Sequence, residues 1–185
     1  MTEPLSEITD RYRLLHWLVE TGRTGSWAEI GVAQGNHARQ MLRTGGFSSL
    51  YLIDTWEDDP YWMEMTGQEK YESCLEILRN CPDPPCTMIR KTSVDAAKLF
   101  DDQSLDFAFI DADHSYASAR EDIAAWYPKV RDGGVIAGHD YTDWETMGVI
   151  QAVDEFVEAE NLSLHVIPPA PNDNEVWVAV KEPKQ

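Results

Sequence analysis

The feature that most constrains the fold is a regular alternation of short apolar runs with amphipathic stretches along most of the chain. The apolar runs have the length of strands, and the stretches between them carry apolar residues at helical spacing. Repeated strand–helix units build a parallel sheet with helices on its faces. The expected units are strand 27–32 with helix 36–44, strand 49–55 with helix 68–81, strand 86–92 with helix 94–100, strand 105–111 with helix 117–130, and strand 133–139 with helix 148–160.

Further segments precede and follow these units. A helix is expected over about 6–20, so that residues 1–22 form an N-terminal helical cover over the sheet or over a substrate entrance. Residues 164–168 and 175–181 are strand-like, and the Pro- and Asn-rich stretch between them favours a reversing loop. The sequence therefore predicts an α/β fold, a Rossmann-like seven-stranded sheet with helices on both faces and a C-terminal antiparallel β-hairpin.

Length and charge limit the number of domains and the kinds of partner. At 185 residues the chain fits one domain, 1–185, with its core over 27–181. Fifteen Lys and Arg against 33 Asp and Glu give a formal charge of −18, which argues against nucleic acid because phosphate binding depends on clustered Lys and Arg. No run approaches the about 18 apolar residues of a membrane span, and the N-terminus lacks the pattern of a secretory signal. We expect a cytoplasmic protein without a membrane partner.

Acids and imidazoles follow two of the later strands. Asp111 and Asp140 both come after apolar runs, so both should lie at the carboxyl ends of neighbouring parallel strands, where open α/β sheets place their ligands. His114 lies three residues after Asp111, and His139 directly precedes Asp140. Asp113 is better explained as a loop acid or helix cap, because only one of two near-adjacent acids easily faces a crevice. One crevice would hold this group together with the glycine turn that follows the first strand.

These motifs resemble those of class I S-adenosylmethionine-dependent methyltransferases. The chain is most similar to a small bacterial family typified by Asp-x-Asp-His-Ser-Tyr, here 111–116, followed by Gly-Gly-x-Ile-x-x-His-Asp-Tyr, here 133–141. The resemblance covers 27–181 and implies the seven-stranded sheet described above. It also implies S-adenosylmethionine as cofactor and methylation of an oxygen on a small-molecule acceptor, a sugar or an aromatic metabolite.

The resemblance also assigns the residues that hold the cofactor. In the family's first motif the glycines let the backbone approach the methionine moiety and Glu29 fixes the loop, while Ala33 stands where many class I enzymes have glycine. Asp54, 25 residues after Glu29, matches the acid that accepts hydrogen bonds from the ribose hydroxyls. Thr92 and Ser93 match the position that contacts adenine. The implied cofactor-binding set is Glu29, Gly31, Gly35, Asp54, Thr92, Ser93 and Asp111.

An attacking hydroxyl must lose its proton, and the sequence offers two groups that could promote this loss: a bound metal ion and a histidine that acts as a base. Metal-dependent O-methyltransferases of catechols and macrolide sugars resemble this pattern: an acid, a base three residues later, then a ligand pair after the next strand. The match makes Asp111 and His114 the catalytic residues, with His114 as general base, and Asp111, His139 and Asp140 the metal ligands. Oxygen ligands suit Mg²⁺, but imidazole does not, so either His139 is not a ligand or the metal is softer, such as Mn²⁺, Fe²⁺ or Zn²⁺. The need for a metal stays open.

Two other functions stay open beside methyl transfer. A NAD-dependent oxidoreductase also requires an acid about 20 residues beyond a glycine turn, but Gly31-x-x-x-Gly35 lacks the middle glycine of that fingerprint. A non-catalytic cofactor-binding module would keep the fold as a scaffold, although the acids and imidazoles argue against it. Loops 56–67 and 141–147 should select the acceptor, and apolar residues of the N-terminal helix suit either a substrate cover or a homodimer.

Overall fold

The computed structural model describes residues 3–58, 64–81, 85–144, 147–169, 171 and 173–183, and its elements follow the expected alternation. The strands are β1 (Ser26–Ile30), β2 (Ser49–Asp54), β3 (Cys86–Arg90), β4 (Leu105–Ile110), β5 (Val130–Gly138), β6 (Leu164–Ile167) and β7 (Val176–Val180). The helices are α1 (Arg11–Glu20), α2 (Asn36–Thr44), α3 (Gly67–Asn80), α4 (Ser93–Ala97), α5 (Tyr116–Trp126) and α6 (Val149–Ala159), with 3₁₀ turns at Leu5–Glu7 and Tyr127–Lys129.

All seven strands form one sheet in the order β3-β2-β1-β4-β5-β7-β6. Strands β1 to β5 pair in parallel, whereas β7 is antiparallel to both β5 and β6. The predicted seven-stranded sheet with an antiparallel C-terminal hairpin is thus confirmed. The chain order reverses between β1 and β4, and open α/β sheets bind ligands at such a switch point.

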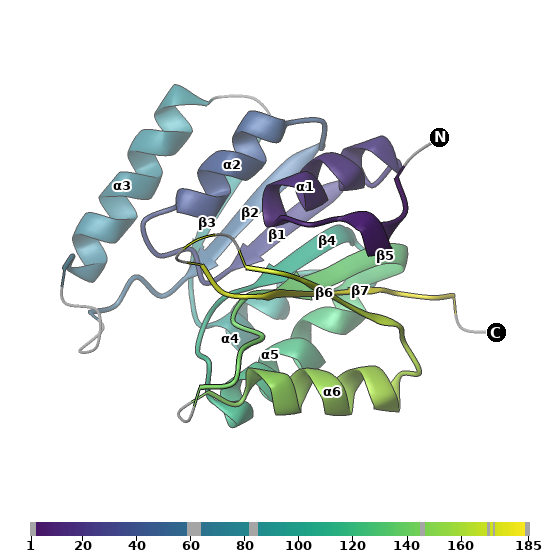
Figure 1. The fold of residues 1–185 in the computed structure, drawn as a ribbon. Helices are drawn as coiled ribbons and strands as arrows, with labels where there is room; N and C mark the ends of the chain where they lie inside the picture. Colours follow the sequence, from purple (N-terminus) through teal and green to yellow (C-terminus); the bar gives the residue numbers. More distant parts are fainter. Residues whose placement is uncertain are drawn as a thin grey trace.

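Helices cover both faces of the sheet (Figure 1). Helices α1, α2 and α3 contribute to one apolar cluster, and α4, α5 and α6 contribute to the other. Strand β4 is buried along its whole length, with Phe107 and Phe109 in the first cluster and Ala108 and Ile110 in the second. Alternate residues of this strand therefore reach opposite layers, which is why it reads as an unbroken apolar run.

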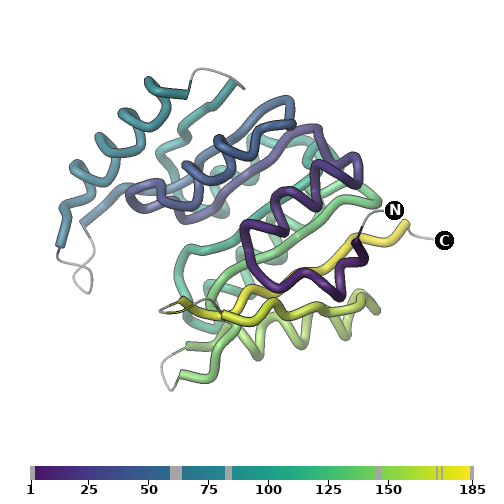
Figure 2. Tube along the Cα trace, turned by 45° about the horizontal axis from the view of Figure 1, so that its top comes forward, coloured from purple at the N-terminus to yellow at the C-terminus, as the bar shows by residue number. Residues whose placement is uncertain are grey.

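The N-terminal helix is shorter than the sequence predicts. It begins at Arg11, because the Asp10 side chain accepts hydrogen bonds from the backbone N–H groups of Tyr12 and Arg13. The preceding segment runs beside the C-terminal hairpin (Figure 2), where Ile8 joins the same apolar cluster as Ile167 of β6. The start of α1 consequently lies next to the loop between β6 and β7.

Other predicted boundaries are wrong by a few residues. The helix expected over 117–130 ends at Trp126, because Pro128 lacks a backbone N–H and turns the chain into a 3₁₀ segment. Strand β3 ends at Arg90, two residues early, because Thr92 caps α4 through its side chain. Parts of both expected acceptor loops, residues 59–63 and 145–146, lie outside the described residues. Within the described ranges, no helix has the length and apolar character required to cross a membrane.

Candidate active site at the switch point of the sheet

The ends of β1, β4 and β5 come together at one edge of the sheet. Their registers align Ile30 with Ile110, and Ile110 with Gly138. The ladder continues past the strands, since the Asp111 N–H donates to the Ile30 carbonyl and the His139 N–H to the Ile110 carbonyl. The structure therefore brings the glycine turn, Asp111 and the His139–Asp140 pair to one place, as predicted.

The glycine turn needs its glycines for close packing as well as for its backbone angles. Gly31 has a φ of +85°, and a Cβ added there would lie 2.0 Å from the Asp111 carbonyl oxygen. Gly35 has a φ of +86° directly before α2, and its Cβ would meet the Ile77 side chain at 2.9 Å. Larger residues at these positions would separate β1 from the end of β4 or push α3 away.

Asp54, rather than Glu29, fixes this turn. One carboxylate oxygen of Asp54 accepts from the N–H groups of Val32 and Ala33 at 2.9 and 2.8 Å, and the other accepts from Trp56 at 2.7 Å. The Trp56 indole N–H closes the arrangement by donating to the Ala33 carbonyl at 2.9 Å. The loop-fixing role expected of Glu29 thus falls to Asp54, whose contact with ribose stays a prediction.

Glu29 and His37 form a buried polar pair beneath the turn. They are 1% and 5% exposed, and their closest atoms, Oε1 and Nδ1, are 3.8 Å apart, too far for a hydrogen bond. Burial raises the pKa of Glu29 well above its usual range and lowers the pKa of His37 to about 3, so His37 is uncharged at neutral pH. Oε2 of Glu29 and both ring nitrogens of His37 have no hydrogen-bond partner among the described residues. Unpaired groups of this kind cost about 1 to 3 kcal/mol each, which favours a polar ligand here.

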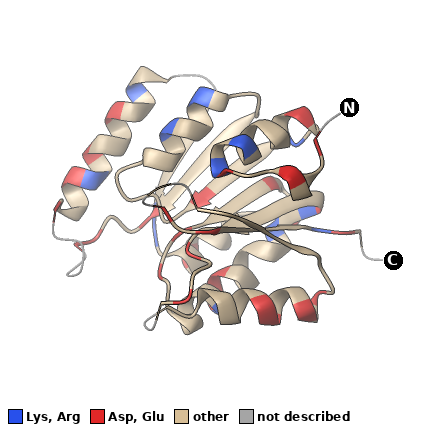
Figure 3. Ribbon diagram, in the orientation of Figure 1, with Lys and Arg blue, Asp and Glu red and all other residues tan. Residues whose placement is uncertain are grey.

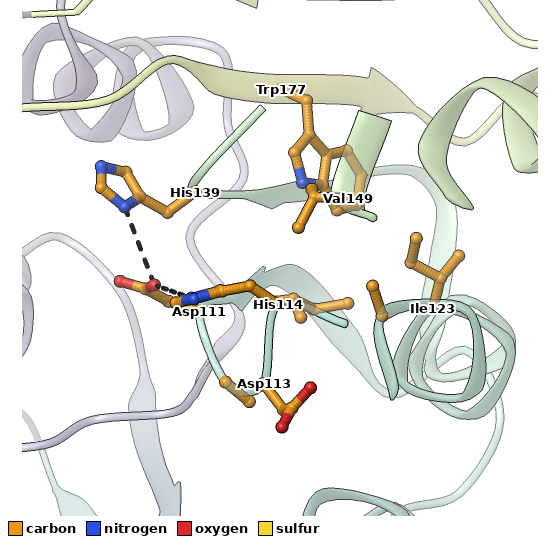
Figure 4. A pocket seen from close by; sticks show the side chains of 10 residues that line it. Asp111, Asp113, His114, Ile123, His139, Val149 and Trp177 are labelled. Atoms are coloured by element: carbon orange, nitrogen blue, oxygen red, sulfur yellow. Dashed lines mark ion pairs between the residues drawn. The ribbon is translucent and has the colours of Figure 1, made fainter. Parts of the chain in front are cut away.

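Two imidazoles, those of His114 and His139, approach the carboxylate of Asp111 from different sides (Figure 4). Nε2 of His114 lies 2.8 Å from Asp140 Oδ2 and 3.6 Å from Asp111 Oδ1. Nδ1 of His139 lies 3.3 Å from Asp140 Oδ2 and 3.7 Å from Asp111 Oδ1. The short His114 contact is electrostatic, because the N–H direction does not meet hydrogen-bond geometry. Four side chains therefore converge on one point, but they are not locked together by hydrogen bonds.

The charges in this cluster influence each other strongly. The carboxylates of Asp111 and Asp140 raise the pKa of His114 to about 10, although burial opposes the shift. Burial also acts to raise the pKa of Asp140, but contacts with His114, His139 and Asn174 outweigh it and hold the pKa well below its usual range. Without a further cation, His114 is an imidazolium at neutral pH and cannot accept a proton.

The donor set at this point fits a divalent cation. One ligand atom each from Asp111, His139 and Asp140 lies within 4.8 Å of the others. Two carboxylates with one imidazole suit Mn²⁺, Fe²⁺ or Zn²⁺ better than Mg²⁺, which prefers an all-oxygen shell. Figure 3 shows acidic residues on α3 and α6 as well as in the loops, and the formal net charge of −18 attracts cations to the protein generally.

Other predicted residues have structural partners. Asp113 accepts from the Ser115 N–H at 2.8 Å, and its carboxylate turns away from the cluster in Figure 4. Thr92 caps α4, and Ser93 Oγ accepts from the Trp126 indole N–H at 2.9 Å. The adenine contact expected of Thr92 and Ser93 remains a prediction.

The structure adds three residues that sequence reasoning missed. Asp173 and Asn174, in the loop between β6 and β7, contact His139 and Asp140. Arg11 at the start of α1 contacts Asp173. In the sequence these loop residues signal only a turn, and nothing in their spacing indicates a partner 34 positions away.

Comparison with known proteins gives one family and a consistent fold. Residues 28–141 match a family described as a methyltransferase domain. The chain is 27% identical over 137 residues to uncharacterized protein R132 of Acanthamoeba polyphaga mimivirus, covering 71% of this chain and 59% of that relative. The chain thus spans about three fifths of the length of this curated relative.

Solved structures share the architecture at low sequence identity. The O-methyltransferase NovP superposes with a TM-score of 0.68 at 20% identity, covering 94% of this chain and 80% of NovP. An O-methyltransferase from Bacillus cereus in complex with SAH superposes with a TM-score of 0.66 at 15% identity, covering 96% of this chain and 84% of the other. At such identities the likeness establishes the Rossmann-like fold of S-adenosylmethionine-dependent methyltransferases and leaves the acceptor to the site itself.

Proposed function

This chain belongs to the methyltransferase domain family, and we propose that it moves a methyl group from S-adenosylmethionine to a hydroxyl oxygen of a small metabolite, a sugar or an aromatic compound. The observation that carries the proposal is the convergence of Asp111, His114 and Asp140 beside the glycine turn. A methyl donor in the turn and a hydroxyl at the cluster would be neighbours. The family match also favours methyl transfer over the oxidoreductase alternative.

The buried polar pair suits the amino-acid end of the cofactor. Neutral His37 has one N–H to donate to a carboxylate, and Oε2 of Glu29 can accept from an ammonium group. Asp54 already accepts three backbone N–H groups, and a carboxylate has about four acceptor positions. One position therefore remains for a ribose hydroxyl. Bound S-adenosylmethionine supplies an electrophilic methyl group on a positively charged sulfur.

The reaction forms one bond and breaks another. With S-adenosylmethionine bound, the acceptor oxygen would take the methyl carbon, the electron pair of the carbon–sulfur bond would stay with sulfur, and the hydroxyl proton would go to a base of this chain. We assign that base to Nε2 of His114, which lies at the cluster and points toward Asp111 and Asp140. It can accept the proton only when the negative charges of those two carboxylates are compensated.

Asp111, His139 and Asp140 would hold a divalent cation, which supplies positive charge to stabilise the developing oxyanion. Neutralising Asp111 and Asp140 removes the cause of the raised His114 pKa, so cation binding and base activity are coupled at this site. On the other side of the pocket, Ile123 and Val149 belong to the buried apolar cluster of α5 and α6 (Figure 4).

The test is a search for product. Purified protein is incubated with S-adenosylmethionine and a panel of catechols, phenols and hydroxylated sugars, with Mn²⁺ or with a chelator, and S-adenosylhomocysteine is quantified. Acceptor-dependent product that increases with Mn²⁺ supports the proposal. No product with any acceptor, together with a thermal shift on adding NAD instead of S-adenosylhomocysteine, would contradict it.

A further inference from the structure

The loop between β6 and β7 contacts both members of the His139–Asp140 pair. Nε2 of His139 lies 2.9 Å from Oδ1 of Asp173, and the Asn174 side-chain amide donates to Oδ1 of Asp140. Asp173 therefore contacts His139, and the next residue of the loop, Asn174, contacts the next residue after β5, Asp140. The loop comes from the far edge of the sheet, so it connects the hairpin to the switch point.

The contact with Asp173 determines which nitrogen of His139 faces the cluster. An ionised carboxylate can only accept, so the nitrogen beside it, Nε2, carries the proton. In the neutral ring this leaves the lone pair on Nδ1, the atom that faces Asp111 and Asp140 at 3.7 and 3.3 Å. Carboxylate partners of this kind fix the tautomer and orientation of a metal-binding imidazole and increase its basicity.

Asp173 is itself held from the other side. Its second oxygen, Oδ2, lies 3.3 Å from Nε of Arg11, at the first turn of α1. The side chains of Arg11 and Asp173 are each 19% exposed, so the pair is largely shielded from water. Arg11 holds Asp173 in place, which links α1, the hairpin loop and β5 in one chain of contacts.

We propose that Asp173 and Asn174 are positioning residues that set the orientation of His139 and Asp140, and that the hairpin loop thereby controls how tightly this edge of the sheet binds a divalent cation. The part concerning cation affinity rests on the proposed function. The part concerning orientation does not, because the contacts exist among the chain's own side chains.

Mn²⁺ affinity tests the first part. Chelator-treated full-length protein is titrated with Mn²⁺ by calorimetry for the wild type, Asp173→Ala, Asp173→Asn and Asn174→Ala. We expect Asp173→Ala and Asn174→Ala to weaken binding by about 10- to 100-fold. Asp173→Asn should lose less, because an amide oxygen still accepts from Nε2. Glu175→Ala is the matched control, since it removes a charge from the same loop. Among the described residues the Glu175 side chain makes no hydrogen bond or ion pair with the cluster, so the affinity of this variant should not change.

Nitrogen-15 spectra of the histidine rings test the second part without any cation. At an alkaline pH where the ring is neutral, His139 should be the Nε2–H tautomer in the wild type and a mixture in Asp173→Ala. Wild-type affinity in both Ala variants, or an unchanged tautomer, would overturn the proposal. A wild type that binds no Mn²⁺ but shows the tautomer change would contradict the cation part of the proposed function and leave the positioning role intact.

Discussion

Strand β4 has a carboxylate at each end, and the two have opposite surroundings. Asp106, near its start, accepts from the Gly25 N–H at 2.7 Å and from the Arg131 guanidinium at 2.6 Å. Its buried charge is therefore paired with a cation and a backbone donor. Such an arrangement stabilises the fold and leaves nothing for a ligand to bind.

Asp111, directly after the end of the same strand, faces imidazoles and another acid instead. Its nearest charged partners are His114 and His139 at 3.6 and 3.7 Å, and within the described ranges it pairs with no Lys or Arg. The amino end of the strand thus satisfies its charge within the protein, whereas the carboxyl end retains negative charge. The contrast indicates that the amino end contributes stability, whereas the carboxyl end has the carboxylates that the proposed cation binding and proton transfer require.

The substitution with the largest expected effect on activity lies at the carboxyl end of β4. His114→Ala should lower kcat by about 10² to 10⁴ because the proton acceptor is removed, while the affinity for S-adenosylhomocysteine stays within about twofold. Steady-state kinetics and calorimetry on the same preparation measure both quantities. An activity loss below threefold would remove His114 from the mechanism.

A substitution at the amino end of β4 should lower the stability of the protein and leave its ligand affinity unchanged. Asp106→Ala leaves the Gly25 N–H and the partly exposed Arg131 without their partner, so the free energy of unfolding should fall by about 2 to 3 kcal/mol. Urea denaturation measures this loss. At a temperature where the variant is folded, its affinity for S-adenosylhomocysteine should equal that of the wild type, and a weaker affinity would show that the two ends are not independent.

Acid should lower the free energy of unfolding through His37, which lies beneath the glycine turn at the carboxyl end of β1. Its pKa is about 3 in the folded protein against 6.5 in the unfolded chain, so the unfolded state binds the proton first. The contribution of neutral His37 to the free energy of unfolding is complete above about pH 6.5. Below that pH it falls by about 1.4 kcal/mol for each pH unit. His37→Gln should flatten this dependence between pH 6.5 and 4.5, as measured by urea denaturation at several pH values.

Glu29 changes the pH dependence of the free energy of unfolding in the opposite direction. Its pKa is raised in the folded state, so its contribution is present at low pH and is lost as pH rises through the folded pKa. Because the wild type and His37→Gln both contain Glu29, the difference between their pH dependences of stability reports on His37. The exposed His16→Gln is the control, and an equal flattening there would assign the effect to net charge.

The smallest expected effect concerns the glycine turn. Ala33 has a φ of +48°, the left-handed region, where a Cβ costs about 1 kcal/mol. Ala33→Gly should relieve that cost, and after the larger entropy of the unfolded chain it should raise stability by up to about 0.5 kcal/mol. Ala117→Gly, at an exposed position in the first turn of α5, should lower stability by about 0.5 kcal/mol. The same sign in both variants would contradict the strain in the turn.

The fold could be predicted because its signal is repeated along the chain. Strand β4 is buried on both faces, so an unbroken apolar run marks it, and the helices between strands show their own spacing. The boundary errors arose where local chemistry overrides the periodic pattern. Asp10 starts α1 and Pro128 ends α5, and both residues act through backbone N–H groups rather than through apolar spacing.

The site was only partly predictable. Asp111, His114 and Asp140 follow strand ends, so their convergence follows from the parallel sheet alone. The role of Glu29 does not, because alternation along β1 turns its side chain to the same face as Trp27, under α2 and against His37, and away from the loop. Asp173 reaches the site only through the way the hairpin folds back, which no local pattern encodes.

Calorimetric titration of S-adenosylhomocysteine into chelator-treated protein, repeated with Mn²⁺ present, is the decisive measurement for methyl transfer at this edge of the sheet. We predict binding in the micromolar range without the cation, because the buried pair and the turn are proposed to bind the cofactor, and a separate heat of Mn²⁺ binding that Asp111→Ala abolishes. No heat and no thermal shift with S-adenosylhomocysteine under either condition would contradict the assignment of this edge as a methyl-transfer site.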